Sequence, residues 1–236
     1  MRIRILALLP AAAALALVPR TAAAQGEFHW KGKIAPGKAI EIKGVNGDVR
    51  GVAGSGDVEV TAVKHARRSD PDDVKIEVVQ HEDGVTICAV YPSDGRRENT
   101  CDAGKGGHMN VQDNDVTVDF TVRVPAGVRF LGNTVNGDVS YDGTIKDGGR
   151  YRFTTHDGDL RVSVPEKASV TVTVSTFDGD FSACFPVQLS RKSKHRFDLT
   201  IGAGSARVEL ESFNGDIHLC RPGQVMKPEG DHNHEH

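Results

Sequence analysis

Aromatic residues are scarce in this chain of 236 residues, which contains one Trp, three Tyr and nine Phe. A core built from such a sequence has to be packed mainly by aliphatic side chains, and β-branched Val and Ile favour strands. No segment has the pattern of an amphipathic helix of convincing length. Glycine is plentiful by contrast, with 26 residues, and indicates frequent tight turns. The composition therefore favours an all-β protein.

Long apolar runs are missing everywhere except at the start of the chain. Arg2 and Arg4 precede an apolar run from Ile5 to Val18, and small residues up to Ala24 offer a cleavage site. This order is typical of a secretory signal peptide, and the run is too short for a comfortable membrane span of ~20 residues. We expect residues 1–24 to be removed and the mature chain, with no transmembrane segment, to be exported to the periplasm, the cell surface or the medium.

An excess of positive charge is also absent. The formal net charge is −3, from 29 basic and 32 acidic residues. Loss of Arg2, Arg4 and Arg20 with the signal peptide leaves 26 − 32 = −6. A mildly acidic protein has no electrostatic reason to bind nucleic acid or anionic lipid.

Signatures of common catalytic sites are missing too. The chain has no Gly-x-Ser-x-Gly elbow, and Gly104-Lys105 is followed by Gly106 where a phosphate loop needs Ser or Thr. Asp119 and Glu209 are conspicuous acids at outward positions of their expected strands, but nothing singles out a pair. We predict no catalytic, cofactor-binding or metal-binding residues. The alternative is a polysaccharide-active enzyme that uses carboxylates on a solenoid face.

A short phrase recurs along the chain. It has the form apolar or aromatic residue, Asn or Asp, Gly, Asp, apolar residue, and its copies begin at Val45, Val135, His156, Phe177 and Phe213. Asp138 to Asp159 and Asp159 to Asp180 are both 21 residues apart. A fixed period near 20 is typical of stacked coils, and Asn-Gly and Asp-Gly mark the turns.

Apolar and polar residues alternate after each phrase, which predicts a half-buried strand. All copies share one phase, so we predict a β-solenoid of stacked short strands. The predicted core includes Val139, Leu160, Val162, Phe181, Ile217 and Leu219. The outward positions form a candidate exposed binding face of Ser140, Arg161, Ser182 and His218.

The repeated Asp residues allow two interpretations. Calcium prefers oxygen ligands, but the known calcium-binding solenoid repeat has nine residues and more glycine than these spacings provide. The favoured interpretation is that each Asp caps its own turn by accepting local backbone N–H groups.

The four cysteines of an exported chain predict two disulfides. Cys184 and Cys220 occupy the same position of equivalent strands, and neighbouring strands lie ~4.8 Å apart, within disulfide reach. We therefore pair Cys184 with Cys220, which leaves Cys88 for Cys101.

The organisation predicted from these patterns has four parts. After the signal peptide, residues 25–130 form an irregular, sandwich-like β region with a long loop at 92–112. Residues 131–221 form the repeat solenoid, and residues 222–236 form a disordered tail. An uncapped solenoid end leaves self-association possible.

The Val-Asn-Gly-Asp-Val phrases, the export signal and the segment Val124-Pro125-Ala126-Gly127-Val128 together resemble the putative adhesin domain family of bacteria. The resemblance covers roughly Ala39 to Cys220. It implies an exported, β-solenoid-like, non-catalytic adhesin or scaffold whose partner is an unknown surface glycan or envelope protein. It supplies no catalytic residues. His156 and Phe177 depart from the Val of more regular phrases.

Overall fold

The computed structural model describes residues 26–93, 95–104 and 106–224. The described chain contains seventeen strands and a single short 3-10 turn, Pro71–Asp73. The prediction of an all-β protein is confirmed. The predicted signal peptide lies outside the described residues, and so do residues 225–236 of the predicted tail. No helix in the described ranges is long and apolar enough to cross a membrane.

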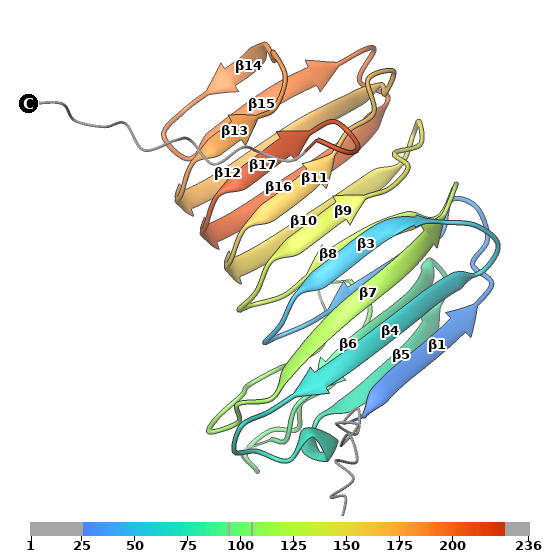
Figure 1. The fold of residues 1–236 in the computed structure, drawn as a ribbon, viewed down its shortest axis with the longest axis vertical. Helices are drawn as coiled ribbons and strands as arrows, with labels where there is room; N and C mark the ends of the chain where they lie inside the picture. The colour runs from blue at the N-terminus through green and yellow to red at the C-terminus, as the bar shows by residue number, and fades with distance from the viewer. Residues whose placement is uncertain (1–25, 94, 105, 225–236) are drawn as a thin grey trace, which may run out of the picture.

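The strands form two mixed sheets that face each other (Figure 1). Sheet A has eight strands in the order β1 (Glu27–Gly32), β4 (Val58–His65), β7 (Thr117–Pro125), β3 (Val49–Gly54), β9 (Val139–Asp142), β11 (Leu160–Ser163), β17 (Ile217–Cys220) and β13 (Phe181–Ala183). Sheet B has nine strands in the order β14 (Leu189–Lys192), β15 (Arg196–Ile201), β12 (Val170–Asp178), β16 (Ala206–Asn214), β10 (Arg150–Asp157), β8 (Arg129–Asn133), β2 (Ala39–Lys43), β6 (Gly84–Val90) and β5 (Lys75–His81).

Each copy of the repeated phrase forms a corner between the sheets. A strand of sheet B leads into the corner, and the next strand continues in sheet A, as in β8–β9 and β10–β11. Equivalent strands of neighbouring coils pair in parallel, with Leu160 opposite both Val139 and Ile217. The result is the ladder of tilted coils in Figure 1.

The structure is solenoid-like, but it is not one regular solenoid whose coils follow chain order. The coil β16–β17 lies between β10–β11 and β12–β13, and β6–β7 stacks on the far side of β2–β3. Antiparallel strands extend both sheets at the ends, with β4 and β1 on sheet A and β5, β15 and β14 on sheet B. Strands before residue 130 thus continue the same two sheets.

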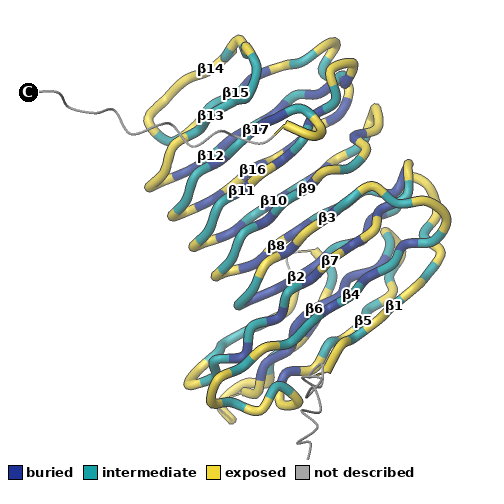
Figure 2. Tube along the Cα trace, in the orientation of Figure 1, coloured by how far each residue is buried: buried dark blue, intermediate teal, exposed yellow. Residues whose placement is uncertain are grey.

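The core lies between the sheets, where buried side chains line the inside of every coil (Figure 2). Phe130, Tyr141 and Phe153 pack together at its centre, with ring centroids 5.2–5.7 Å apart. Five of the six predicted core residues are buried: Val139, Leu160, Val162, Ile217 and Leu219. Phe181 is the exception, because its strand β13 is the last of sheet A and leaves it half-buried.

Glycine is required at the corners by close approach of the backbones. A Cβ atom on Gly158 would lie 2.1 Å from the carbonyl oxygen of Gly137, and one on Gly215 would lie 2.0 Å from that of Gly158. Both glycines have positive φ, 156° and 147°. The Gly of the phrase therefore serves stacking as well as the turn.

Both predicted cysteine pairs are joined in the structure. Cys184 and Cys220 lie on neighbouring strands with Cα atoms 4.7 Å apart, and Cys88 and Cys101 have Cα atoms 5.7 Å apart. The second pair ties the loop between β6 and β7 to the outer face of sheet B.

Candidate functional site

The first residues of three phrases form an exposed row along the corner. His156, Phe213 and Phe177 stack in that order, and His195 from the turn before β15 extends the row. Successive ring centroids are 4.8, 4.8 and 5.0 Å apart. Phe177 is 60% exposed and Phe213 is 44% exposed. His156 is also exposed and His195 is half-buried, and we call these four stacked rings the ring row.

The residue before each of His156, Phe177 and Phe213 explains why these rings point outward. Thr155, Thr176 and Ser212 are buried, and each donates its hydroxyl to the carbonyl of a corner glycine in the neighbouring coil, at 2.8–3.2 Å. Side chains alternate along a strand, so an inward Thr or Ser places the next side chain outside. The phrase thus fixes the ring row in register with the stack.

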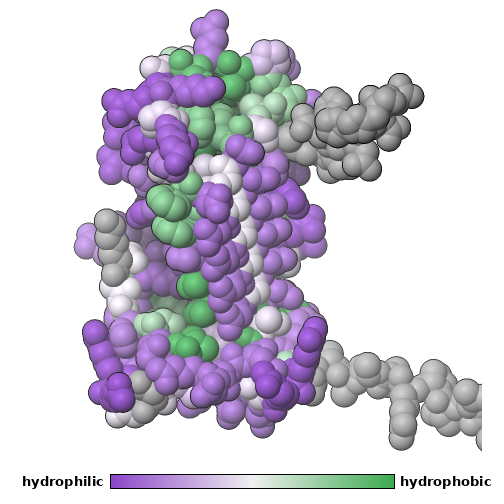
Figure 3. All heavy atoms as spheres, turned by 90° about the vertical axis from the view of Figure 1, so that its left-hand side faces the viewer, coloured by the Kyte–Doolittle hydropathy of each residue, from purple (hydrophilic) through white to green (hydrophobic). Residues whose placement is uncertain are grey.

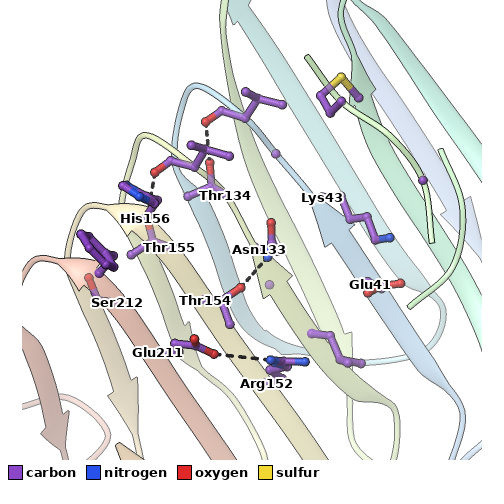
Figure 4. A pocket seen from close by; sticks show the side chains of 18 of the residues that line it. Glu41, Lys43, Asn133, Thr134, Arg152, Thr154, Thr155, His156, Glu211 and Ser212 are labelled. Carbon is purple, nitrogen blue, oxygen red and sulfur yellow. Dashed lines mark hydrogen bonds and ion pairs between the residues drawn. The ribbon is translucent and has the colours of Figure 1, made fainter. Parts of the chain in front are cut away.

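A groove of about 880 Å³ lies beside the ring row, on the outer face of sheet B. Its floor includes Asn133, Arg152 and Thr154 (Figure 4). Residues 106–109 of the loop between β6 and β7 line one end. Figure 3 views the molecule from the side where the strands of sheet B end, and shows apolar patches beside a hydrophilic column that runs up the stack. The groove therefore runs across the coils.

The charged side chains of the groove are paired within the protein. Lys43 donates to the carbonyls of Asp102 and Gly106, at 2.5 and 3.0 Å. Glu41 accepts from the hydroxyl of Thr86 and the backbone N–H of Gly104. These bonds hold the loop against sheet B and form the closed end of the groove.

Arg152 in the middle of the floor lies between two carboxylates. Its guanidinium is 3.5 Å from Glu209 and 3.4 Å from Glu211. The floor beside it is uncharged, with Asn133 donating to the hydroxyl of Thr154 at 2.5 Å. Among its described residues, the groove therefore offers hydroxyl and amide groups and little free charge.

The predicted binding face lies on the other sheet. Arg161 is directly opposite Ser140 on one side and His218 on the other, and Ser182 is opposite His218. Ser182 and His218 share a hydrogen bond of 2.8 Å. The structure brings all four residues together in one row on the outside of sheet A.

The corner carboxylates bond between coils, which corrects the expectation that each Asp caps its own turn. Asp138 accepts the backbone N–H of Asp159 at 2.8 Å, and Asp159 accepts that of Asp216 at 2.9 Å. Hydrogen bonds from Asn214 and His156 lower the pKa of Asp157, which lies two residues before Asp159 in the same phrase. Within the described ranges, no group of three or more His, Cys, Asp or Glu side chains has the arrangement of a metal site.

The two acids considered for catalysis are separated. Asp119 is on β7 of sheet A, where it accepts the backbone N–H of Asp48 and faces His65 at 3.6 Å. Glu209 is on β16 of sheet B beside Arg152. They do not form a carboxylate pair.

Sequence reasoning missed the ring row and the groove. One signal was available, because His156, Phe177 and Phe213 each follow a Thr or Ser whose side chain the strand pattern places inside. The predicted Cys88–Cys101 pair tied the loop to one strand of sheet B, but nothing in the sequence indicated that the loop reaches Lys43 and closes a groove.

The comparisons with known proteins agree with this fold. A model of the Toastrack DUF4097 family matches residues 39–220. Among solved structures, the chain is similar to one described as a putative cell adhesion protein from Clostridium sporogenes ATCC 15579, with a TM-score of 0.50 and 10% identity over 83% of this chain and 100% of that chain. At this identity the likeness shows the fold alone.

Another solved structure, described as a putative adhesin from Bacteroides fragilis NCTC 9343, aligns with a TM-score of 0.22 and 10% identity over 83% of this chain and 97% of that chain. That score carries no argument. No curated protein matches the chain.

Proposed function

Because the chain belongs to the Toastrack DUF4097 family, we propose that it is a non-catalytic, adhesin-like protein of the cell envelope or its surroundings. The structural neighbour from Clostridium sporogenes is named for cell adhesion, and its fold is shared over most of this chain. The resemblance inferred from the sequence points in the same direction.

One observation carries the proposal: the coils stack into a rigid body with outer faces that repeat from strand to strand. Corner hydrogen bonds between coils fix this spacing, as between Asp138 and Asp159. On sheet A the repeat presents Arg161, Ser140 and His218 at adjacent positions. A rigid repeating face suits a ligand that repeats, because several weak contacts then act together.

Two structural features support a location outside the cytoplasm. The chain has two disulfides and, among its described residues, no free cysteine. Disulfides persist mainly in oxidising compartments. The signal peptide predicted from the sequence points to the same location.

The location is tested by protease treatment of intact cells, with the folded body followed by an antibody. Digestion of the body on intact cells would place the protein at the surface and support direct adhesion. Protection until the outer layer is opened would exclude direct adhesion and leave a scaffold role inside the envelope.

The binding face is tested by replacing Ser140, Arg161, Ser182 and His218 with Ala and measuring attachment of cells or envelope material to the purified protein. Loss of attachment with an unchanged melting temperature would support the face on sheet A. Retained attachment would show that the binding surface lies on another part of the stack.

A further inference from the structure

We propose that the groove over sheet B binds an uncharged, extended, β-linked glycan that lies along the stack, with the ring row as its apolar wall. The proposal rests on the proposed binding function and assigns a site and a ligand class to it. It concerns the sheet opposite to the face predicted from the sequence.

The spacing of the groove argues for a sugar polymer. The rings of His156, Phe213, Phe177 and His195 repeat every 4.8–5.0 Å along the groove. An extended β-linked glycan advances by a similar length for each sugar unit, so successive units would meet successive coils. A peptide strand advances by ~3.3 Å per residue and would lose this match within a few residues.

The charges of the groove argue for a neutral ligand. Lys43 is held by two carbonyls, and Arg152 lies between Glu209 and Glu211. A polyanion such as nucleic acid or a polyuronate would have to separate these pairs or meet the two glutamates. A neutral sugar would leave them intact and lie beside them.

The polar groups of the floor argue for hydroxyl-rich partners. The Thr154 hydroxyl accepts from the amide of Asn133, so its own hydrogen is available to donate, and the Asn133 carbonyl oxygen is an acceptor. Sugar hydroxyls can donate to one and accept from the other. The rings of Phe177 and Phe213 are stacked face to face, with an interplanar angle of 9°, so their exposed edges would form an apolar wall against the C–H groups of the sugar units.

The test uses the full chain, expressed with export and purified with its disulfides formed. The probes are soluble β-1,4-linked oligomers of glucose and of N-acetylglucosamine, with an α-1,4-linked glucose oligomer and a polyuronate as controls. Affinity is measured by titration calorimetry. We expect binding of at least one β-linked neutral probe and no binding of either control.

Two matched variants locate the site. In Phe177→Ala/Phe213→Ala we expect at least about a tenfold loss of affinity for the bound probe. In Arg50→Ala/Thr121→Ala, a pair of exposed residues opposite each other on the outside of sheet A, we expect no change. All four side chains are on outer faces, so both variants should keep the melting temperature. Thr154→Gln, which fills the floor, gives a second variant of the groove and should also lose affinity.

Three results would overturn the proposal. They are no binding of any β-linked probe, equal binding by wild type and both groove variants, and loss of binding only in the sheet A variant. Cell attachment distinguishes failure of the glycan groove from failure of the proposed adhesin-like function. If wild type attaches to cells but binds no β-linked probe, the adhesin-like function stands and the glycan groove falls.

Discussion

The carboxylate of Asp48 accepts the backbone N–H of Asp138 at 2.9 Å, across 90 positions of sequence. The same bond joins each pair of neighbouring corners, and the series runs from Asp119 through Asp48, Asp138, Asp159 and Asp216 to Asp180. Each carboxylate thereby satisfies a donor that belongs to the next coil. The repeated Asp is thus a contact between coils.

This series of hydrogen bonds predicts that a carboxylate in its middle contributes more to stability than the carboxylate at its end. Asp138→Ala leaves the N–H of Asp159 without its acceptor and should lower the free energy of unfolding by about 1–2 kcal/mol. Asp138→Asn keeps an oxygen acceptor and should lose less. The check is denaturant unfolding.

Asp180→Ala is the matched control, because the Asp180 carboxylate accepts no hydrogen bond from any residue in the described part of the chain. It should leave stability within about 0.5 kcal/mol of wild type. Equal losses in Asp138→Ala and Asp180→Ala would contradict the role of the carboxylates as contacts between coils.

The corner glycines should tolerate no side chain. Gly215→Ala puts a Cβ atom 2.0 Å from the backbone oxygen of Gly158, and neither backbone can move away without breaking the stack. We expect a loss of more than about 3 kcal/mol, or failure to fold. Gly148 has a positive φ of 73°, but a Cβ atom there would have no atom within 4 Å, so Gly148→Ala should cost about 1 kcal/mol. Similar melting temperatures for the two variants would contradict the argument.

Chelation should leave the fold unchanged. The corner carboxylates accept backbone N–H groups, as Asp159 accepts the N–H of Asp216. They therefore already have hydrogen-bond donors in the place where a bound cation would contact them. We expect the same melting temperature with an excess of chelator as with added calcium. A lower melting temperature in chelator, restored by calcium, would show that the corners hold the ion.

The register of the strands could be predicted from the sequence, because the alternation after each phrase is local and repeated. Leu160 is fully buried, as its position after Asp159 predicts. Leu160→Asp should therefore cost at least about 4 kcal/mol or prevent folding, because it buries an unpaired charge. Arg161→Ala, one residue on and exposed, should cost about 1 kcal/mol or less. A soluble Leu160→Asp protein that melts cooperatively would contradict the register.

The order of the coils could not be predicted in full, for a physical reason. The phrases are nearly equivalent, so any two can stack, and only a longer connection decides which do. In the sequence, the hairpin of β14 and β15 separates the coil β12–β13 from the coil β16–β17. In the structure, β16–β17 lies between β10–β11 and β12–β13, so that β17 pairs with β11. Cys184 and Cys220 were the one sequence signal for this neighbourhood. The groove was missed for a different reason: the predicted Cys88–Cys101 pair ties the loop to β6, but the loop closes the groove through other nonlocal contacts, such as Lys43 to Gly106.

Alkaline pH should destabilise the protein through its buried tyrosines. Burial raises the pKa of Tyr91 from 10.0 to about 12, and burial also raises the pKa of Tyr141. The folded state therefore holds these phenolic protons more tightly than the unfolded state. The resulting stability is complete below the unfolded pKa of 10.0 and is lost as pH rises toward about 12.

Tyr91→Phe separates this effect from general alkaline damage. The variant loses the hydrogen bond from the Tyr91 hydroxyl to the Val116 carbonyl, and should be about 1 kcal/mol less stable than wild type near neutral pH. It also lacks one of the titrating groups, so its free energy of unfolding should fall less between about pH 9 and about pH 11. The measurement is urea unfolding of both proteins at these two pH values. Parallel losses in wild type and variant would show that Tyr91 does not couple folding to alkaline pH, since a buried phenol that ionises only on unfolding must make the wild-type curve the steeper one.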